Sequence, residues 1–290
     1  MKKIGVASFL LFTIIAFSAF SQAPSALYPF SMEYNPDRTL IRIDSPEGFD
    51  RYPIKKMDMF QTWITNLPLC PAGRRVARWD NQAIMSADSV TAVIDFGVAT
   101  SNQRDADIPL QLMAEFLRAS NKLGDFPIIL NQGDTVTFDK WLNGEYYYNS
   151  AQQLAHRDGP KREASDQEYH RYLQFVITQN DNKSLRRNLV PITESEITPG
   201  AIYIQFQKDA PDSTGHAAVI LDVCANKKGE TLYLAGWGGN PAHAFIVARP
   251  WPITKRIWFN LAELKQQLKE YGDGSFFRFP TRFPLQKAMK

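Results

Sequence analysis

His216 follows a glycine and opens the apolar run HAAVILDV, so an ionisable ring stands at the start of a predicted strand. A thiol hydrolase needs a cysteine of lowered pKa, often at a helix N-terminus. It also needs a histidine base within hydrogen-bond reach and a polar group that orients that histidine. His216 and Asn240, just beyond the next predicted strand at residues 230–235, fit the last two roles. A structural histidine that merely caps the strand is the alternative.

The nucleophile of such a site is harder to find, because the chain has only two cysteines, Cys70 and Cys224. Cys224 lies eight residues after His216, roughly 26 Å away along a continuous strand, and is better explained as a small buried hydrophobe. Cys70 lies in a proline-bearing loop, where Arg74 and Arg75 could lower the thiol pKa. Cys70 is therefore a candidate nucleophile, a packed loop residue or one half of a disulfide with Cys224.

Two carboxylates occupy the predicted helix start at which a catalytic cysteine would be expected. Asp107 precedes Pro109, which fits only the first turn of a helix, and Asp107 is placed to cap that helix. Asp105 has no evident structural role. Beside His216 it could act as a base or a metal ligand, although no metal-ligand spacing in the chain supports a metal site.

The segment AGWGGNPAH is predicted to be a loop, because three glycines and a proline surround its tryptophan. Trp237 in this loop is either a platform for a sugar or peptide or a side chain that plugs the core. His243 ends the segment and could approach His216 across the sheet. We therefore take Trp237 and His243 as candidate ligand-binding residues.

The elements that must position these residues follow from periodicity and capping patterns. Apolar spacing predicts helices around residues 54–64, after Asp107, after a Ser165–Glu168 capping box, and after Asn260. Strands are predicted at LIRIDSP, VTAVIDFGV, FPIIL, TVTF, PGAIYIQF, HAAVILDV, ETLYLA and SFFRF. The fold class predicted is α+β, with N-terminal helices packed on a late antiparallel sheet, in one domain over residues 24–290.

The N-terminal segment MKKIGVASFLLFTIIAFSAFSQA has the layout of a secretory signal peptide over residues 1–23. Its apolar stretch is short for a bilayer span, so we expect an exported periplasmic or extracellular protein with no stable membrane span after cleavage. A retained N-terminal anchor is the alternative. A net charge of +3 gives no reason to expect nucleic-acid binding. No phosphate loop or dinucleotide fingerprint is present, so no cofactor is expected.

The order of the motifs AEFL, KWLNG, PGAIYIQF, GHAAVILDV and PAHAFIVARP resembles the domain of unknown function 4846 family of secreted Bacteroidota proteins. The resemblance runs from about Asp44 to Phe279 and implies no established activity. The histidine strand is also similar to that of NlpC-type and CHAP-type peptidases, which implies a papain-like core. Relatives commonly carry a cysteine near the position of Asp105 and a glutamine at Gly236, so a thiol and a polar partner are both missing here.

These observations predict an exported cell-envelope protein whose papain-like cleft has lost its catalytic thiol and binds a peptide or glycan, such as peptidoglycan. The first alternative is an active peptidoglycan amidase or endopeptidase, with His216 as base, Asn240 as orienting residue and Cys70 as nucleophile. The second alternative is a structural or interaction protein without a catalytic site.

Overall fold

The computed structural model describes residues 24–85, 90–97, 100–124, 126–148, 154–156, 159–206, 215–239, 241–251, 256–269 and 272–280. The expected signal peptide at residues 1–23 and the candidate Asn240 lie outside these ranges. Within the described ranges, no helix is long and apolar enough to cross a membrane.

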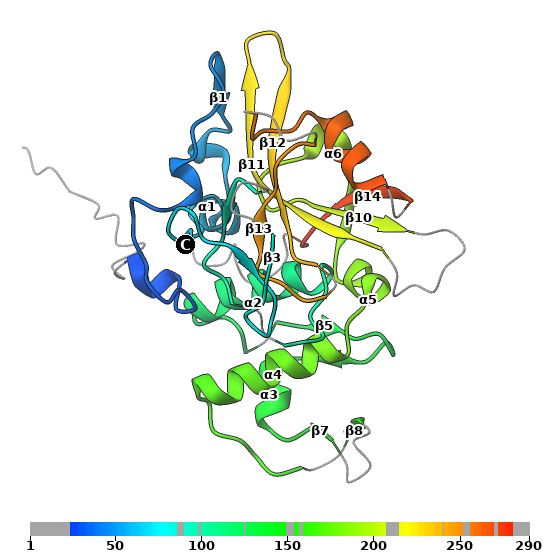
Figure 1. The fold of residues 1–290 in the computed structure, drawn as a ribbon. Helices are drawn as coiled ribbons and strands as arrows, with labels where there is room; N and C mark the ends of the chain where they lie inside the picture. Colours follow the sequence, from blue (N-terminus) through cyan, green and yellow to red (C-terminus); the bar gives the residue numbers. More distant parts are fainter. Residues whose placement is uncertain are drawn as a thin grey trace, which may run out of the picture.

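The centre of the fold is a sheet in which, over the described residues, eight strands are paired antiparallel (Figure 1). Its order is β4-β13-β12-β11-β10-β14-β9, and β1 pairs with the far end of β11. The strands are β1 (Phe49–Arg51), β4 (Ala92–Val93), β9 (Val190–Ile192), β10 (Ile202–Phe206), β11 (Ala217–Asn226), β12 (Thr231–Trp237), β13 (Ile246–Val247) and β14 (Asp273–Arg278). The late antiparallel sheet expected from the sequence is thus present.

Three two-stranded ladders and six α-helices complete the described part of the chain. The ladders pair β2 (Val76–Ala77) with β3 (Ala83–Met85), β5 (Ile128–Ile129) with β6 (Thr135–Val136), and β7 (Tyr146–Tyr148) with β8 (Leu154–His156). The helices are α1 (Met59–Thr65), α2 (Asp107–Ala119), α3 (Phe138–Leu142), α4 (Asp166–Thr178), α5 (Asn182–Arg187) and α6 (Leu261–Leu268). Short 3-10 helices are η1 (Pro24–Leu27), η2 (Leu40–Arg42), η3 (Ile54–Lys56) and η5 (Glu194–Glu196).

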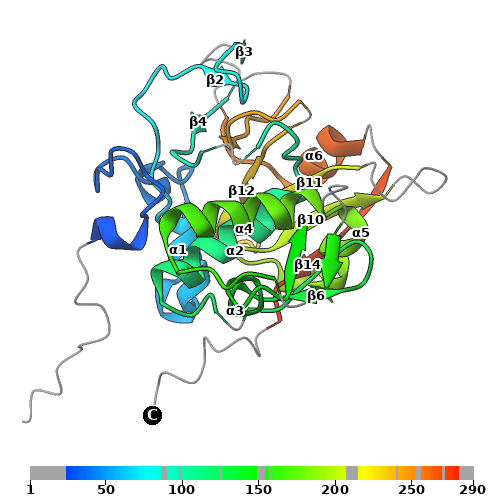
Figure 2. The same ribbon diagram turned by 90° about the horizontal axis from the view of Figure 1, so that it is seen from below.

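Helices cover both faces of the sheet, and two apolar clusters fill the spaces between. Along β10 and β11, alternate side chains belong to different clusters. One cluster also contains residues of α1, α2 and α4, and the other contains residues of α6. Figure 2 shows α1, α2 and α4 on one side of the strands and α6 on the other. Alternation along a strand sends successive side chains to opposite faces, so β11 is buried on both.

A bulge at Leu221 reverses the alternation within β11. Ile220 pairs with Ala235 of β12, and Asp222 pairs with the adjacent Leu234. Leu221, between them, is therefore an extra residue on β11. An extra residue exchanges the faces of every residue beyond it. The bulge therefore divides β11 into two segments. The first follows His216, and the second continues into the hairpin with β12.

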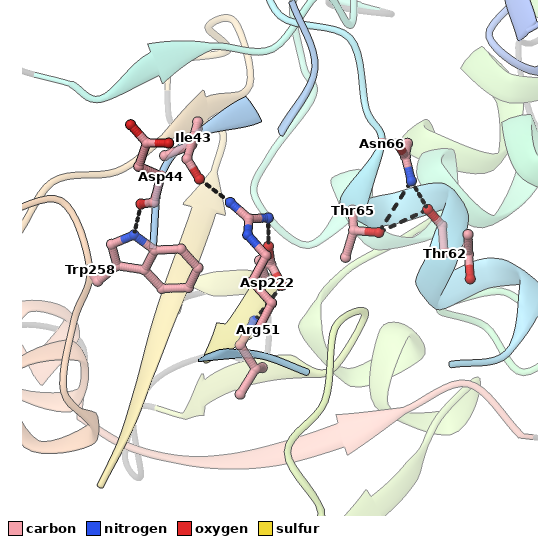
Figure 3. Close-up of polar contacts among 9 residues, drawn as sticks. Ile43, Asp44, Arg51, Thr62, Thr65, Asn66, Asp222 and Trp258 are labelled. Carbon is pink, nitrogen blue, oxygen red and sulfur yellow. Dashed lines mark hydrogen bonds and ion pairs between the residues drawn. The ribbon is translucent and has the colours of Figure 1, made fainter. Parts of the chain in front are cut away.

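Asp222, next to the bulge, is buried and ion-paired with Arg51 from β1 (Figure 3). The same guanidinium donates to the Ile43 carbonyl, and Trp258 Nε1 donates to the Asp44 carbonyl at 2.8 Å. Burial raises the pKa of Asp222, and the charge of Arg51 opposes that shift. The contacts of Arg51 therefore attach the N-terminal segment to the second part of β11, away from His216.

Several local predictions need correction. The segment LIRIDSP is not a strand: Arg42 and Ile43 donate backbone hydrogen bonds to Thr39 and Leu40, which makes the short 3-10 helix η2. The buried strand expected at VTAVIDFGV is reduced to β4. The hairpin of β5 and β6 and the helices α4 and α6 lie where the sequence places them.

Candidate functional site

His216 lies immediately before β11, and its carbonyl accepts the Gln205 N–H at 2.9 Å. Gly215 precedes it with a φ of +141°. A Cβ atom on Gly215 would lie 2.6 Å from both Asn182 Nδ2 and the Gln205 carbonyl oxygen. Only glycine combines this backbone conformation with so close an approach. Gly215 therefore fixes the backbone position of His216 at the start of β11.

The turn that leads into α2 brings Asp105 against this histidine. Asp105 is only 4% exposed, and its Oδ2 contacts Nδ1 of His216. Its other oxygen, Oδ1, is buried and has no hydrogen-bond partner among the described residues. A buried carboxylate oxygen without a donor is costly, so its presence requires an explanation.

Burial and a neighbouring histidine disfavour the charged form of the His216 imidazole. Burial, together with the nearby His243, lowers the pKa of His216 to about 4. A charge on Asp105 works in the opposite direction, because a neighbouring carboxylate favours the imidazolium form. Nδ1 of His216 lies against Asp105 Oδ2. In the tautomer that carries its proton on Nδ1, Nε2 is the acceptor nitrogen of the ring.

Asp107, two residues later, has a different role from the one expected. The N-cap residue of α2 is Ala106, without a side-chain cap, and Asp107 is the first residue of the helix. The fully buried Asp107 carboxylate accepts from Asn180 Nδ2 at 2.6 Å and from the Arg104 N–H at 2.7 Å. Burial raises its pKa to about 6. Asp107 therefore ties α2 to the chain before α5, and the prediction of a capping aspartate is wrong.

The chain beyond β12 closes the other side of the site with two glycines. A Cβ atom on Gly238 would lie 3.7 Å from Asp105 Oδ1, and one on Gly239 would lie 2.1 Å from His243 Nε2. His243 is 7% exposed, and its Nδ1 faces the Ala244 carbonyl oxygen at 2.8 Å. Burial lowers its pKa. The structure thus brings His243 close enough to His216 to affect its pKa, and the absence of a side chain on Gly239 lets the His243 ring pack against the backbone.

Trp237 is half-buried and packs against the cluster under α6 and against a small cluster around β4 and β13. Its ring centroid lies 6.3 Å from that of Phe259. Of the two interpretations of Trp237, the packing role agrees better with these contacts than the role of a ligand platform.

Neither cysteine belongs to this group, and both thiols are free. Cys70 donates its backbone N–H to Val93, and burial and Asp95 raise its thiol pKa. Arg74 does lower that pKa, as expected from the sequence, but the opposing effects are larger. Cys224 is fully buried on β11, where burial raises its pKa to about 12. The expected activation of Cys70 is therefore wrong, and the disulfide alternative is not the observed state.

Sequence reasoning overlooked the hairpin of β2 and β3, which runs beside the site. Trp79, 51% exposed, donates its backbone N–H to the Ala242 carbonyl at 3.1 Å. The run RRVARWD, with three arginines and a tryptophan in seven residues, was the available signal. Within the described residues, no group of three or more His, Cys, Asp or Glu side chains could hold a metal ion.

The fold and this site define a mixed α/β protein with a large antiparallel sheet. The N-terminus of α2 faces a histidine at the start of β11, an interior strand of that sheet. The chain belongs to the family described as domain of unknown function (4846), whose model matches residues 40–279. No curated protein and no solved structure matches the chain.

Proposed function

We propose that this is an exported cell-envelope protein with a papain-like, NlpC-like cleft that binds a peptide or glycan without forming a covalent intermediate. The arrangement of α2 against the start of β11 supports this interpretation. In a thiol hydrolase of this layout, a cysteine at the helix N-terminus faces the histidine. Here Asp105 makes that contact, and a carboxylate cannot replace a thiolate as the attacking group of a thioester mechanism.

The observation that carries the proposal is the buried Oδ1 of Asp105, which lacks a donor among the described residues. An amide N–H, an ammonium group or a hydroxyl group of a ligand would satisfy it. A hydrogen bond to a charged acceptor contributes about 1.5–3 kcal/mol, and more is lost if the acceptor stays buried without it. Peptides and glycans both offer such donors.

A second candidate function is hydrolysis by an activated water molecule. It is favoured by one observation, namely the contact of His216 Nδ1 with the Asp105 carboxylate. In this mechanism Nε2 takes a proton from water while the water oxygen adds to a carbonyl carbon. The proton then passes to the leaving amine as its bond to carbon breaks. The thiol version with Cys70 is not carried forward, because its thiol pKa is raised.

The test incubates the mature protein with purified peptidoglycan and measures both sedimentation with the polymer and released fragments by mass spectrometry. For binding without cleavage, we expect co-sedimentation and no new fragments. Asp105→Asn and His216→Ala should both weaken co-sedimentation, while Cys70→Ser should leave it unchanged. Fragments released by the wild type but not by His216→Ala would instead establish the hydrolase. Equal co-sedimentation of wild type and Asp105→Asn would contradict the proposed site.

A further inference from the structure

A cavity of about 220 Å³ lies between the loop before β2, the β2–β3 hairpin and the chain that leads toward α2. We call it the arginine groove and define it by Arg74, Arg75, Trp79, Phe96 and Gly97. Gly97 also accepts a hydrogen bond from the Gln111 side chain of α2 at 3.3 Å. The groove therefore continues from the hairpin to the helix whose first turn follows Asp105.

Backbone pairing places the groove next to the candidate site. Ala244 donates its N–H to the Ala77 carbonyl at 2.9 Å, and Arg78 forms an isolated antiparallel bridge with His243. The hairpin is thus one strand away from the segment that carries His243. Neighbouring strands are about 4.8 Å apart, and an extended peptide advances about 3.3 Å per residue. A ligand of a few residues can therefore contact both the groove and the cleft.

The charges of the groove favour an anion. Arg74 and Arg75 are exposed, and neither forms an ion pair within the described part of the chain. Arg78, in contrast, is neutralised by Asp80. The carboxylate of the groove, Asp95, accepts from Ser31 Oγ at 2.6 Å. Besides the pair of Arg78 and Asp80, the groove therefore contains two arginines and one carboxylate. Guanidinium groups bind carboxylates through paired hydrogen bonds.

Trp79 adds an apolar surface beside these cations. Its side chain is 51% exposed, and Met32 on the opposite wall is 94% exposed. Large apolar side chains grouped on a rim with cations commonly mark a binding surface. The aliphatic part of a ligand could pack against Trp79 while its charge meets the arginines.

We propose that the arginine groove binds a carboxylate of a peptide whose N–H groups reach the Asp105 cleft. The inference rests on the proposed function and narrows its ligand from peptide or glycan to a carboxylate-bearing peptide. The acceptor at Asp105 and the donors in the groove then recognise opposite polar groups of one peptide.

Isothermal titration calorimetry with two probes tests the proposal. One probe is a tetrapeptide of three alanines and a C-terminal glutamate, and the other is its uncharged analogue with glutamine and a C-terminal amide. We expect the acidic peptide to bind about tenfold more tightly, since a hydrogen bond to a charged group contributes 1.5–3 kcal/mol. High salt should reduce this preference, because ions screen exposed charges.

The variant Arg74→Gln/Arg75→Gln should abolish the preference, and Arg74→Lys/Arg75→Lys should retain part of it. Lys55→Gln/Lys56→Gln is the matched control, because it removes the same charge from an exposed basic pair on η3. Far-UV circular dichroism and the melting temperature check that each variant is folded.

The outcomes separate the groove from the cleft. If both peptides bind equally, or neither binds at millimolar concentration, the groove inference is overturned. If Asp105→Asn weakens both peptides and the arginine variant changes neither, the groove fails while the proposed cleft stands. If the arginine variant removes the preference and Asp105→Asn has no effect, the groove stands and the Asp105 site fails.

Discussion

Asp105 and Asp107 are two residues apart at the start of α2, yet their surroundings differ in kind. Asp107 accepts from Asn180 and from the Arg104 N–H, and Ser184 Oγ in turn donates to Asn180 Oδ1 at 2.8 Å. Asp105 contacts His216 with one oxygen and leaves the other without a donor among the described residues. The first network is complete and stabilises the fold, whereas the second leaves a buried acceptor without a donor among the described residues.

The largest difference should appear in stability. Asp107→Ala removes the acceptor for the buried Asn180 side chain and for the partly buried Arg104 N–H, so the free energy of unfolding should fall by about 3 kcal/mol. Asp105→Ala removes a carboxylate that is poorly satisfied, and we expect a change below about 1 kcal/mol. Urea denaturation at neutral pH measures both. An equal loss in the two variants would remove the distinction between the networks.

A thiol introduced at position 105 tests the layout directly. In Asp105→Cys, the thiol lies at the N-terminus of α2, which lowers a thiol pKa, and beside His216, which can take the thiol proton. We expect iodoacetamide to modify it at least about tenfold faster than Cys70 at neutral pH, as measured by peptide mapping. The reaction should slow in Asp105→Cys/His216→Ala. Modification of Cys70 before the new cysteine would argue against this geometry.

His216 and Asp107 should contribute with opposite signs to the pH dependence of the free energy of unfolding. His216 has a folded-state pKa of about 4 against 6.5, so its contribution is lost as the pH falls from about 6.5 to 4. Asp107 has a folded-state pKa of about 6 against 3.8, so its contribution is lost as the pH rises over nearly the same interval. Each amounts to about 3 kcal/mol at most, and the two largely cancel.

Replacing one group should therefore expose the other. In His216→Gln, the free energy of unfolding should decrease as the pH rises from about 4 to 6, and in Asp107→Asn it should increase. Guanidinium denaturation at several pH values checks both slopes. Parallel slopes in the two variants would contradict the assigned pKa directions.

A more local change tests the glycine that packs against His243. In Gly239→Ala the new Cβ would lie 2.1 Å from His243 Nε2, so the ring must move, at a cost of about 1–3 kcal/mol. Gly97→Ala is the control, because a Cβ there meets nothing within 4 Å. Histidine resonances in NMR spectra should shift in the first variant and not in the second.

The comparison also explains what sequence could and could not predict. His216 and the strands around it were found because a strand of ten residues with a glycine at its entry has a strong local pattern. The helices α4 and α6 were found for a similar reason, since their caps are local: Ser165 accepts from the Glu168 N–H, and Asn260 forms a capping box with Glu263.

The roles of the two aspartates could not be assigned in the same way. Asp107 satisfies every local rule for a cap, but its partner Asn180 is 73 residues away. The hydrogen bond to Asn180 depends on how α2 and the chain before α5 pack together, which no local window contains. The groove was overlooked because its residues become neighbours only through pairing of the hairpin with residues 242–244.

The bulge at Leu221 has a practical consequence for experiments on this protein. Because Asp222 is clamped by Arg51 just beyond it, the hairpin of β11 and β12 is anchored independently of the strand end that carries His216. The hairpin tip around Lys227 and Lys228 is exposed and about 36 Å from His216 along the strand. A dye or a surface tether attached to this turn would therefore leave His216 and Asp105 undisturbed, which makes the turn a suitable attachment point for single-molecule work.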